Sequence, residues 1–235
     1  MTDMSDAASI DAVILCGGMG TRLRPISGDL PKVLVPFAGR PFIDILIGSL
    51  LPFGFRRFIL CTGYRRERLR EHFAGCSYDV IFSEEDEPLG TGGAVKRAAP
   101  LIAGSSFLVV NGDSICPIDF SRFHAFHVQK GGILSLSLAK PLPGQDYGVV
   151  EMGEAQRIIS FREKTSCRDG AFVSGGLYFM RRDIFDHMPP APCFSLEYDL
   201  FPKLLPLGCY GFPTDAELID IGTPERYLQA LQRLS

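Results

Sequence analysis

Short apolar runs alternate with segments of helical pattern through the first half of the sequence. Unbroken short apolar runs are typical of parallel strands that are buried on both faces. Strands that alternate with helices along a chain predict βαβ units and a parallel sheet, so the sequence predicts an α/β fold. The strands are predicted at residues 12–16, 58–61, 78–82 and 107–110, and the helices at residues 42–51, 67–74 and 94–102.

The second half of the sequence has a different pattern. In residues 132–139, apolar residues alternate with serines, which is typical of a mixed or antiparallel extension of the same sheet. Thr223, Pro224 and Glu225 form a helix start with a capping residue, a first-turn proline and an early acidic residue. Further strands are predicted at residues 147–152, 157–161 and 176–180, and helices at residues 195–205 and 223–234.

Composition and charge exclude several kinds of protein. The 235 residues are 46% hydrophobic and 22% charged, which indicates a globular domain with a hydrophobic core rather than a disordered chain. The net charge of −3 gives no global electrostatic basis for binding nucleic acid or a membrane surface. No linker or repeat interrupts the sequence after its polar first ten residues, so we expect a flexible leader over residues 1–10 and a single domain over residues 11–235.

The cysteines and the N-terminal residues indicate the compartment. The 7 cysteines are widely spaced and include no CxxC pair, which argues against a disulfide framework or a zinc knuckle and favours reduced thiols. Residues 1–11 contain no lysine or arginine, whereas a secretory signal begins with positive charge. An apolar run at residues 42–55 contains Asp44 and Pro52 and is too short to span a bilayer. We therefore expect a cytoplasmic protein with no membrane partner.

A glycine-rich segment follows the first predicted strand. Gly17, Gly18 and Gly20 allow backbone N–H groups to approach a phosphate or a nucleobase closely, although a plain tight turn is the alternative. The segment is neither a Walker A loop nor the dinucleotide fingerprint, in which Leu23 would have to be a glycine. An anion-binding loop is favoured because cationic side chains follow the turn, namely Arg22, Arg24 and Lys32.

Asn111, Gly112 and Asp113 follow the strand predicted at residues 107–110. Open α/β sheets bind their ligands at the carboxyl ends of the strands, so Asp113 is a candidate ligand-binding residue. The alternative for this tripeptide is a simple type I′ turn.

A series of motifs along the chain resembles the signature of the sugar-phosphate nucleotidyltransferases, also called NDP-sugar pyrophosphorylases. The resemblance covers about residues 11–235 and implies a Rossmann-like α/β domain with a mixed, mainly parallel central sheet. It also implies the reaction of an NTP with a sugar 1-phosphate, which gives an NDP-sugar and pyrophosphate. In family order, the matching segments are residues 15–23 with 31–32, 87–94, 111–113, 147–150, 161–164, 175–178 and 220–224.

The resemblance further implies a role for individual residues. The attacking group is already a phosphate oxyanion, so catalysis needs positioning and charge neutralisation rather than a strong base. Arg22 is implied to hold the β- and γ-phosphates, Lys32 to contact the transferring phosphate, and Asp113 and Asp220 to bind Mg²⁺ together with the substrate phosphates. The implied nucleotide-binding residues are Leu15, Gly17, Gly18, Gly20, Thr21, Gly90, Thr91 and Gly92, and the implied sugar-phosphate-binding residues are Gly148, Glu163, Lys164 and Gly176.

The motif forms are most similar to those of short D-glycero-α-D-manno-heptose 1-phosphate guanylyltransferases, which make GDP-heptose for surface glycans. Mannose 1-phosphate guanylyltransferases and MurNAc 1-phosphate uridylyltransferases are the alternatives. Glu84, Glu85 and Glu87 precede the second glycine segment, and a carboxylate there would accept hydrogen bonds from guanine N1–H and N2–H₂. GTP is therefore the predicted nucleotide, with Glu84 as the candidate base ligand. The family alone suggests a homodimer.

Two interpretations from other classes stay open. A non-catalytic sugar-nucleotide-binding subunit would have lost the charged residues named above, whereas this sequence retains them all. A metal-dependent glycosyltransferase usually carries Asp-x-Asp, whereas the corresponding segment here is residues 111–113. The product distinguishes the enzymes, since a nucleotidyltransferase releases pyrophosphate and a glycosyltransferase releases a free NDP.

Overall fold

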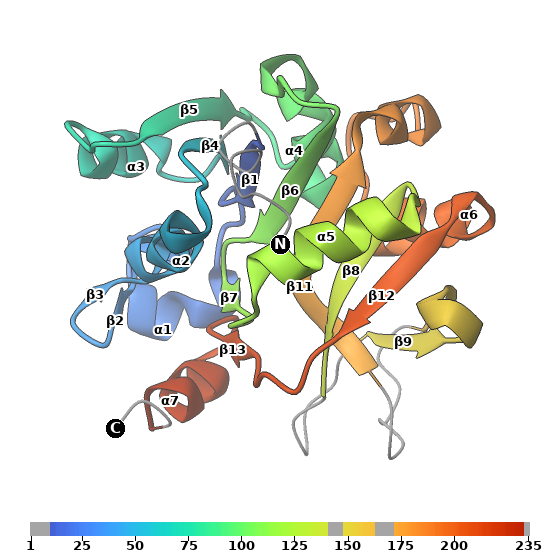
Figure 1. The fold of residues 1–235 in the computed structure, drawn as a ribbon. Coiled ribbons are helices and arrows are strands. Elements are labelled where there is room, and N and C mark those ends of the chain that lie inside the picture. Colours follow the sequence, from blue (N-terminus) through green and yellow to red (C-terminus); the bar gives the residue numbers. More distant parts are fainter. Residues whose placement is uncertain (1–9, 141–147, 163–171, 233–235) are drawn as a thin grey trace.

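A mixed, 9-stranded sheet forms the centre of the computed structural model, which describes residues 10–140, 148–162 and 172–232 (Figure 1). Four neighbouring strands run parallel in the order β6-β1-β4-β5. They confirm the parallel strands predicted from the apolar runs. Their bounds are β1 (Ala12–Leu15), β4 (Arg57–Thr62), β5 (Asp79–Glu84) and β6 (Ser106–Asn111).

The remaining strands extend the sheet in mixed directions, as the second half of the sequence predicts. The long strand β11 (Phe172–Arg181) runs antiparallel to β6 on one side and to β8 (Leu134–Ala139) on the other. Strands β9 (Val149–Met152) and β10 (Ile158–Arg162) continue the sheet from β11. Strand β12 (Cys209–Pro213), which pairs with β8, was not predicted, because its glycine and proline are typical of turns.

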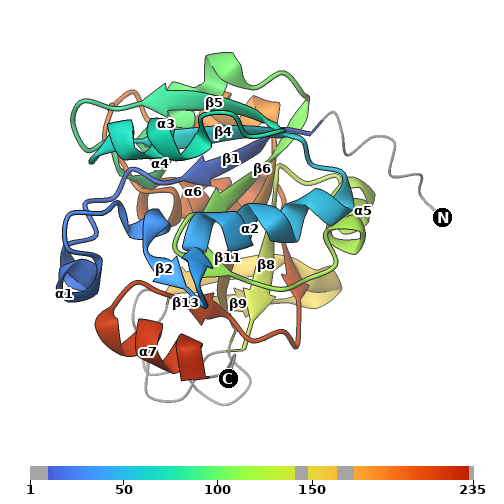
Figure 2. The same cartoon turned by 90° about the vertical axis from the view of Figure 1, so that its left-hand side faces the viewer.

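Helices cover both faces of the sheet, which explains why the parallel strands are apolar on both sides (Figure 2). One face packs against α2 (Phe42–Leu50), α3 (Arg66–Phe73) and α5 (Phe120–Lys130). The other face packs against α4 (Gly90–Ala98) and α6 (Phe201–Leu204). A hydrophobic core therefore lies on each face of the sheet.

Two predicted helices differ from the observed ones. Helix α4 begins at Gly90 rather than at residue 94, so the second glycine segment forms its first turn. The helix predicted at residues 195–205 is split into a π-helical turn (Leu196–Leu200), α6 and a 3₁₀ turn (Leu205–Leu207). Pro202 and Pro206 explain the split, because each removes a backbone donor that a continuous helix needs.

The short elements complete the chain. A two-stranded ribbon pairs β7 (Ser114–Ile115) with β13 (Ile219–Asp220), and another pairs β2 (Pro36–Phe37) with β3 (Arg40–Pro41). Helix α7 (Pro224–Gln232) confirms the helix start at Thr223. The remaining helical segments are α1 (Arg24–Ser27) and 3₁₀ turns at Thr21–Leu23, Lys32–Leu34, Leu51–Phe53, Ala99–Leu101, Glu154–Gln156 and Arg182–His187.

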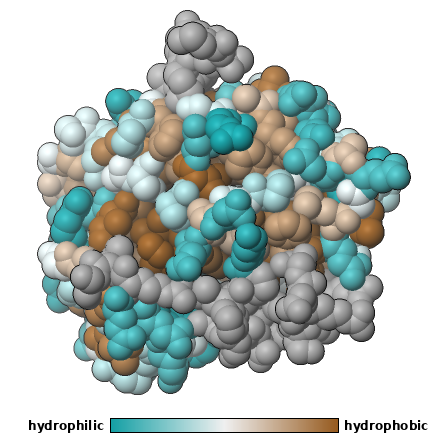
Figure 3. All heavy atoms as spheres, turned by 60° about the horizontal axis from the view of Figure 1, so that its bottom comes forward, coloured by the Kyte–Doolittle hydropathy of each residue, from teal (hydrophilic) through white to brown (hydrophobic). Residues whose placement is uncertain are grey.

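The surface mixes hydrophilic and apolar side chains. Figure 3 turns the bottom of Figure 1 forward and shows apolar side chains gathered in a hollow between hydrophilic ones. Within the described residues, no helix is both long enough and apolar enough to cross a bilayer.

Candidate active site

The glycine segment after β1 packs between two charged side chains. Gly20 has a φ of +58°, and a Cβ there would lie 3.2 Å from the Cβ of Lys32. A Cβ on Gly17 would lie 2.4 Å from Oε1 of Glu85. A side chain at Gly17 would therefore displace the Glu85 carboxylate, whereas Gly20 is favoured as glycine by its left-handed backbone.

A cavity of about 320 Å³ lies at the carboxyl ends of β1 and β6, and we call it the glycine-loop cavity. Thr91 from the first turn of α4 and Lys32 from the 3₁₀ turn Lys32–Leu34 both line it. It continues outward past Glu85 and Pro88 into a second hollow that also involves Gly63 and Tyr64. The residues that line the glycine-loop cavity are Leu15, Cys16, Gly17, Gly18, Met19, Lys32, Val33, Glu85, Pro88, Gly90, Thr91, Ala94, Asn111, Gly112 and Asp113.

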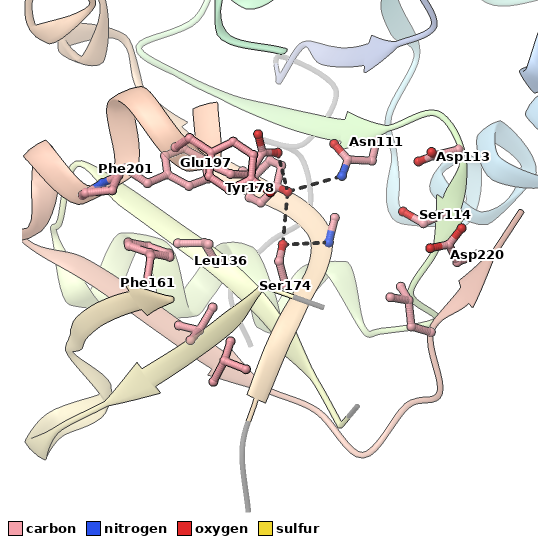
Figure 4. A pocket seen from close by; sticks show the side chains of 17 residues that line it. Asn111, Asp113, Ser114, Leu136, Phe161, Ser174, Tyr178, Glu197, Phe201 and Asp220 are labelled. Atoms are coloured by element: carbon pink, nitrogen blue, oxygen red, sulfur yellow. Dashed lines mark hydrogen bonds between the residues drawn. The ribbon is translucent and has the colours of Figure 1, made fainter. Parts of the chain in front are cut away.

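A second cavity of about 370 Å³ lies against β11, and we call it the β11 cavity (Figure 4). Asn111, Asp113 and Asp220 lie at one end of it, whereas Phe161 and Phe201 lie at the other. Asn111 and Asp113 line both cavities, so the two cavities meet at the end of β6. The full lining is Asn111, Asp113, Ser114, Leu136, Gly148, Val149, Val150, Phe161, Ser174, Gly176, Tyr178, Glu197, Tyr198, Phe201, Pro202, Leu218 and Asp220.

Two carboxylates lie side by side where the cavities meet. The pairing of β13 with β7 sets Asp220 opposite Ser114, and the Ile221 N–H donates to the Asp113 carbonyl at 3.0 Å. The Asp113 carboxylate forms an ion pair with Lys32. The Asp220 carboxylate accepts a hydrogen bond from the Gly222 N–H and one from Arg226 Nη1, the latter at 2.6 Å.

The pKa values of this pair reflect burial and mutual repulsion. Burial raises the pKa of Asp113, but the charge and hydrogen bond of Lys32 outweigh it and hold this pKa below its usual range. Burial and the Asp113 charge raise the pKa of Asp220 above its usual range, despite Gly222 and Arg226. Two oxygen ligands of like charge at this position fit a hard divalent cation such as Mg²⁺, which takes one or two carboxylates plus substrate phosphates. The described residues contain no cluster of three or more metal-binding side chains, so phosphate ligands would have to complete such a site.

A hydrogen-bond network crosses the β11 cavity around Tyr178, which is 1% exposed (Figure 4). Its hydroxyl receives hydrogen bonds from Asn111 Nδ2 at 3.3 Å and from Ser174 Oγ at 3.1 Å, and donates to Glu197 Oε1 at 3.4 Å. Burial raises the pKa of Tyr178 far above its usual range, so this tyrosine stays protonated. The other Glu197 oxygen accepts hydrogen bonds from Thr91 and Ser195, each at 2.8 Å.

The structure gathers many of the residues that the sequence singles out. Lys32, Thr91 and Asp113 line the glycine-loop cavity with Leu15, Gly17, Gly18 and Gly90. Asp113 and Asp220 line the β11 cavity with Gly148 and Gly176. Arg22 lies exposed on the 3₁₀ turn, near enough for its charge to lower the pKa of Asp113, and Thr21 lies exposed beside it. Glu163 and Lys164 lie outside the described residues.

Two predicted nucleotide ligands have other contacts in the structure. The Glu84 carboxylate forms ion pairs with Arg70 and Arg66 on α3, so the carboxylate that faces the glycine segment is that of Glu85. Adjacent residues at the end of a strand point to opposite sides, which explains this offset of one position. Gly92 packs against the Phe194 ring, because a Cβ at this glycine would lie 2.2 Å from that ring.

Sequence reasoning missed several lining residues. Glu197 and Tyr198 come from the π-helical turn, which the sequence predicts only as part of a longer helix. Tyr178 also lines the cavity, although it is almost fully buried. The available signal was that Glu197 and Asp199 are acidic residues near the start of the helix predicted at residues 195–205.

The chain belongs to the nucleotidyl transferase family, whose model matches residues 11–235, and it is a nucleotidyltransferase enzyme. Among curated proteins, it is 34% identical over 228 residues to the D-glycero-alpha-D-manno-heptose 1-phosphate guanylyltransferase of Aneurinibacillus thermoaerophilus, covering 96% of this chain and 98% of the relative. It is 31% identical over 226 residues to the mannose-1-phosphate guanylyltransferase of Mycobacterium tuberculosis, covering 94% of this chain and 63% of that relative. Among solved structures, HddC from Yersinia pseudotuberculosis complexed with GMP-PN superimposes with a TM-score of 0.82 at 35% identity, covering 96% of this chain and 100% of HddC.

Proposed function

We propose that this enzyme transfers a guanylyl group from GTP to D-glycero-α-D-manno-heptose 1-phosphate and releases pyrophosphate. The coarser assignment, a sugar 1-phosphate nucleotidyltransferase, is supported by the activities of both curated relatives. The heptose substrate is supported by sequence similarity, because the chain is 34% identical over 228 residues to the heptose enzyme and 31% identical over 226 residues to the mannose enzyme. GMP-PN in the similar HddC structure agrees with a guanine nucleotide.

We assign the nucleotide to the glycine-loop cavity. Gly17, Gly18 and Gly20 carry no side chains, which lets backbone N–H groups approach a triphosphate. Arg22 and Lys32 add positive charge for the leaving pyrophosphate and for the transferring phosphate, respectively.

The position of Glu85 is the observation that carries the choice of GTP. Its carboxylate lies against Gly17 and Gly63, where added Cβ atoms would come within 2.4 and 2.9 Å of Oε1. Glu85 lines both the glycine-loop cavity and the hollow beyond it, which is the direction in which a base would extend. Guanine offers N1–H and N2–H₂ side by side to a single carboxylate, whereas uracil offers one N–H, and adenine and cytosine each offer one amino group. Loss of such a paired contact is costly, so the carboxylate favours guanine.

We assign the sugar phosphate to the β11 cavity. Glu197 and Ser174 offer polar groups to sugar hydroxyls, and Phe161 and Phe201 form an apolar wall for the C–H faces of the sugar. The phosphate of the sugar would lie toward Asp113 and Asp220, at the junction with the other cavity. The two substrates would then meet where the reaction requires it.

The reaction forms one bond and breaks one. An oxygen of the sugar 1-phosphate attacks the α-phosphorus of GTP, and the bond between this phosphorus and the bridging oxygen to the β-phosphate breaks. No proton has to move, so the protein contributes position and charge. Asp113 and Asp220 would hold Mg²⁺, which supplies charge neutralisation between the two polyanionic substrates. Lys32 pairs with Asp113 and would also bind the transferring phosphate.

The test is a pyrophosphate-release assay with Mg²⁺ that crosses GTP, ATP, UTP, CTP and dTTP with heptose, mannose, glucose and MurNAc 1-phosphates. We expect the highest kcat/KM for GTP with heptose 1-phosphate. A higher value for mannose 1-phosphate, or for another nucleotide, would overturn the corresponding part of the proposal. Release of a free NDP instead of pyrophosphate would overturn the reaction type.

Glu85 and its neighbour Glu84 provide a matched pair of variants that tests how the base is recognised. Glu85→Gln should reduce the preference for GTP over the other nucleotides, because an amide offers one acceptor and one donor group in place of two acceptors. Glu84→Gln should keep the preference, since its carboxylate is engaged by Arg70 and Arg66. An unchanged preference in Glu85→Gln, or a lost one in Glu84→Gln, would contradict the role of Glu85.

A further inference from the structure

We propose that Thr91 is a positioning residue for the sugar phosphate: from the first turn of α4 it fixes the carboxylate of Glu197 in the β11 cavity. The inference rests on the proposed function of that cavity. It differs from the role that the sequence suggests for Thr91, which is to bind the nucleotide.

The first turn of α4 is in close contact with the segment that precedes the π-helical turn. The N–H groups of Gly92 and Gly93 donate to the Phe194 carbonyl at 2.9 and 3.3 Å, and the Phe194 N–H donates to the Leu89 carbonyl at 3.0 Å. A Cβ on Gly93 would lie 2.1 Å from the Pro192 carbonyl oxygen. The glycines of this turn therefore serve a backbone-to-backbone contact that no side chain would permit.

Thr91 adds two hydrogen bonds to this contact. Its hydroxyl accepts from the Leu196 N–H at 2.8 Å and donates to Glu197 Oε2 at 2.8 Å. A threonine hydroxyl has a single hydrogen to donate, so this hydrogen is committed to Glu197. The side chain that lines the glycine-loop cavity is thus bonded to the element that lines the β11 cavity.

Both oxygens of the Glu197 carboxylate accept hydrogen bonds. Oε2 accepts from Thr91 and from Ser195, and Oε1 accepts from the buried Tyr178 hydroxyl at 3.4 Å. Figure 4 shows Glu197 and Tyr178 meeting above the β11 cavity, with Asn111 and Ser174 bonded to the same hydroxyl. A carboxylate fixed in this way presents its remaining lone pairs to a sugar hydroxyl at one position, and loss of Thr91 would free one side of it.

Thr91→Val tests the inference, because valine keeps the shape and removes the hydroxyl. We expect the KM for the sugar 1-phosphate to rise about tenfold, as for loss of a hydrogen bond to a charged group, while the KM for GTP changes less than about twofold. Thr91→Ser keeps the hydroxyl and should restore the KM for the sugar phosphate. Thr214→Val is the matched control, since it removes one hydroxyl that bonds the Ala216 N–H at 3.0 Å outside both cavities.

A double-mutant cycle separates this role from a general loss of structure. Glu197→Gln should raise the KM for the sugar 1-phosphate, and Thr91→Val in that background should add little, because both changes disturb the same contact. Fully additive effects, or a rise in the KM for GTP alone, would overturn the inference. Calorimetric titration of each variant with GTP alone should give the wild-type affinity. If wild-type enzyme releases no pyrophosphate with any sugar 1-phosphate, the proposed function fails, whereas an active wild type with an unaffected Thr91→Val refutes only the role of Thr91.

Discussion

Acidification should destabilise the protein through one buried histidine, His127 on α5. This residue is 3% exposed, its ring stacks on Phe179 with 5.6 Å between the ring centroids, and its Nδ1 lies 2.9 Å from the Ser135 hydroxyl oxygen. Burial, and to a smaller extent the charges of His124 and Arg181, lower the pKa of His127 from 6.5 to about 4. The folded protein therefore resists protonation of a side chain that the unfolded chain protonates readily.

The sign and size of the effect follow from the two pKa values. As the pH falls, the unfolded chain takes up a proton near pH 6.5, whereas the folded protein does so only near pH 4. The contribution of His127 to the free energy of unfolding is complete above the unfolded pKa and is lost as the pH falls to the folded pKa. At about 1.36 kcal/mol per pKa unit, the full loss is about 3 kcal/mol, and the loss between pH 7.5 and pH 5.0 is about 2 kcal/mol.

Urea denaturation at pH 7.5 and pH 5.0 measures this contribution. His127→Asn lowers stability at both pH values because the ring is lost, but the difference between them should shrink by about 2 kcal/mol relative to wild type. Val128→Asn is the control, since Val128 is the next residue on α5 and is 65% exposed, so it should keep the wild-type difference. The same pH dependence in wild type and His127→Asn would refute the reasoning.

Three further predictions concern the active site and the core. Asp113→Asn and Asp220→Asn should each lower kcat in the pyrophosphate assay by about a hundredfold or more without unfolding the protein, and chelation of Mg²⁺ should stop turnover; a variant with wild-type kcat would contradict the paired-carboxylate site. Gly17→Ala should raise the KM for GTP, because its Cβ would lie 2.4 Å from Glu85 Oε1 and displace that carboxylate, and an unchanged KM would count against the position assigned to the base. Asp11→Ala should cost about 2 kcal/mol in urea denaturation because it removes the buried acceptor shared by Arg57 and the Ala103 N–H, while Arg57 keeps Asp79 and the Leu101 carbonyl, and a loss below about 0.5 kcal/mol would contradict this account.

The sequence predicts the parallel part of the sheet because each of its strands contains a short apolar run. It does not predict the start of α4, since glycine disfavours helices and only the distant contact with Phe194 explains a helix that begins at Gly90. Strand β12 was not predicted for a related reason. Its pairing with β8 outweighs the preference of its glycine and proline for turns.

The residues of the candidate site divide in the same way, because some follow from local sequence patterns and others depend on contacts between distant segments. Asp113 is predictable from its place after a strand, but its neighbour Asp220 is brought beside it by the pairing of β7 with β13, which no local pattern indicates. The family resemblance supplied that second residue. Glu85 and Glu197 needed the structure itself, since one depends on which side of a strand end faces the glycines and the other on the contact of α4 with a remote turn.

The meeting of the two cavities at the end of β6 has a consequence for how specificity can change. Residues 15–113 supply the walls of one cavity and residues 111–220 the walls of the other, so the stretch of sequence around Asn111 is all that they share. If the proposed assignment of the two substrates is correct, donor and acceptor preferences are encoded in successive halves of the chain, and a chimera joined just after β6 should exchange one preference at a time. Such a chimera has to preserve the hydrogen bond between Thr91 and Glu197, because one residue comes from each half of the chain.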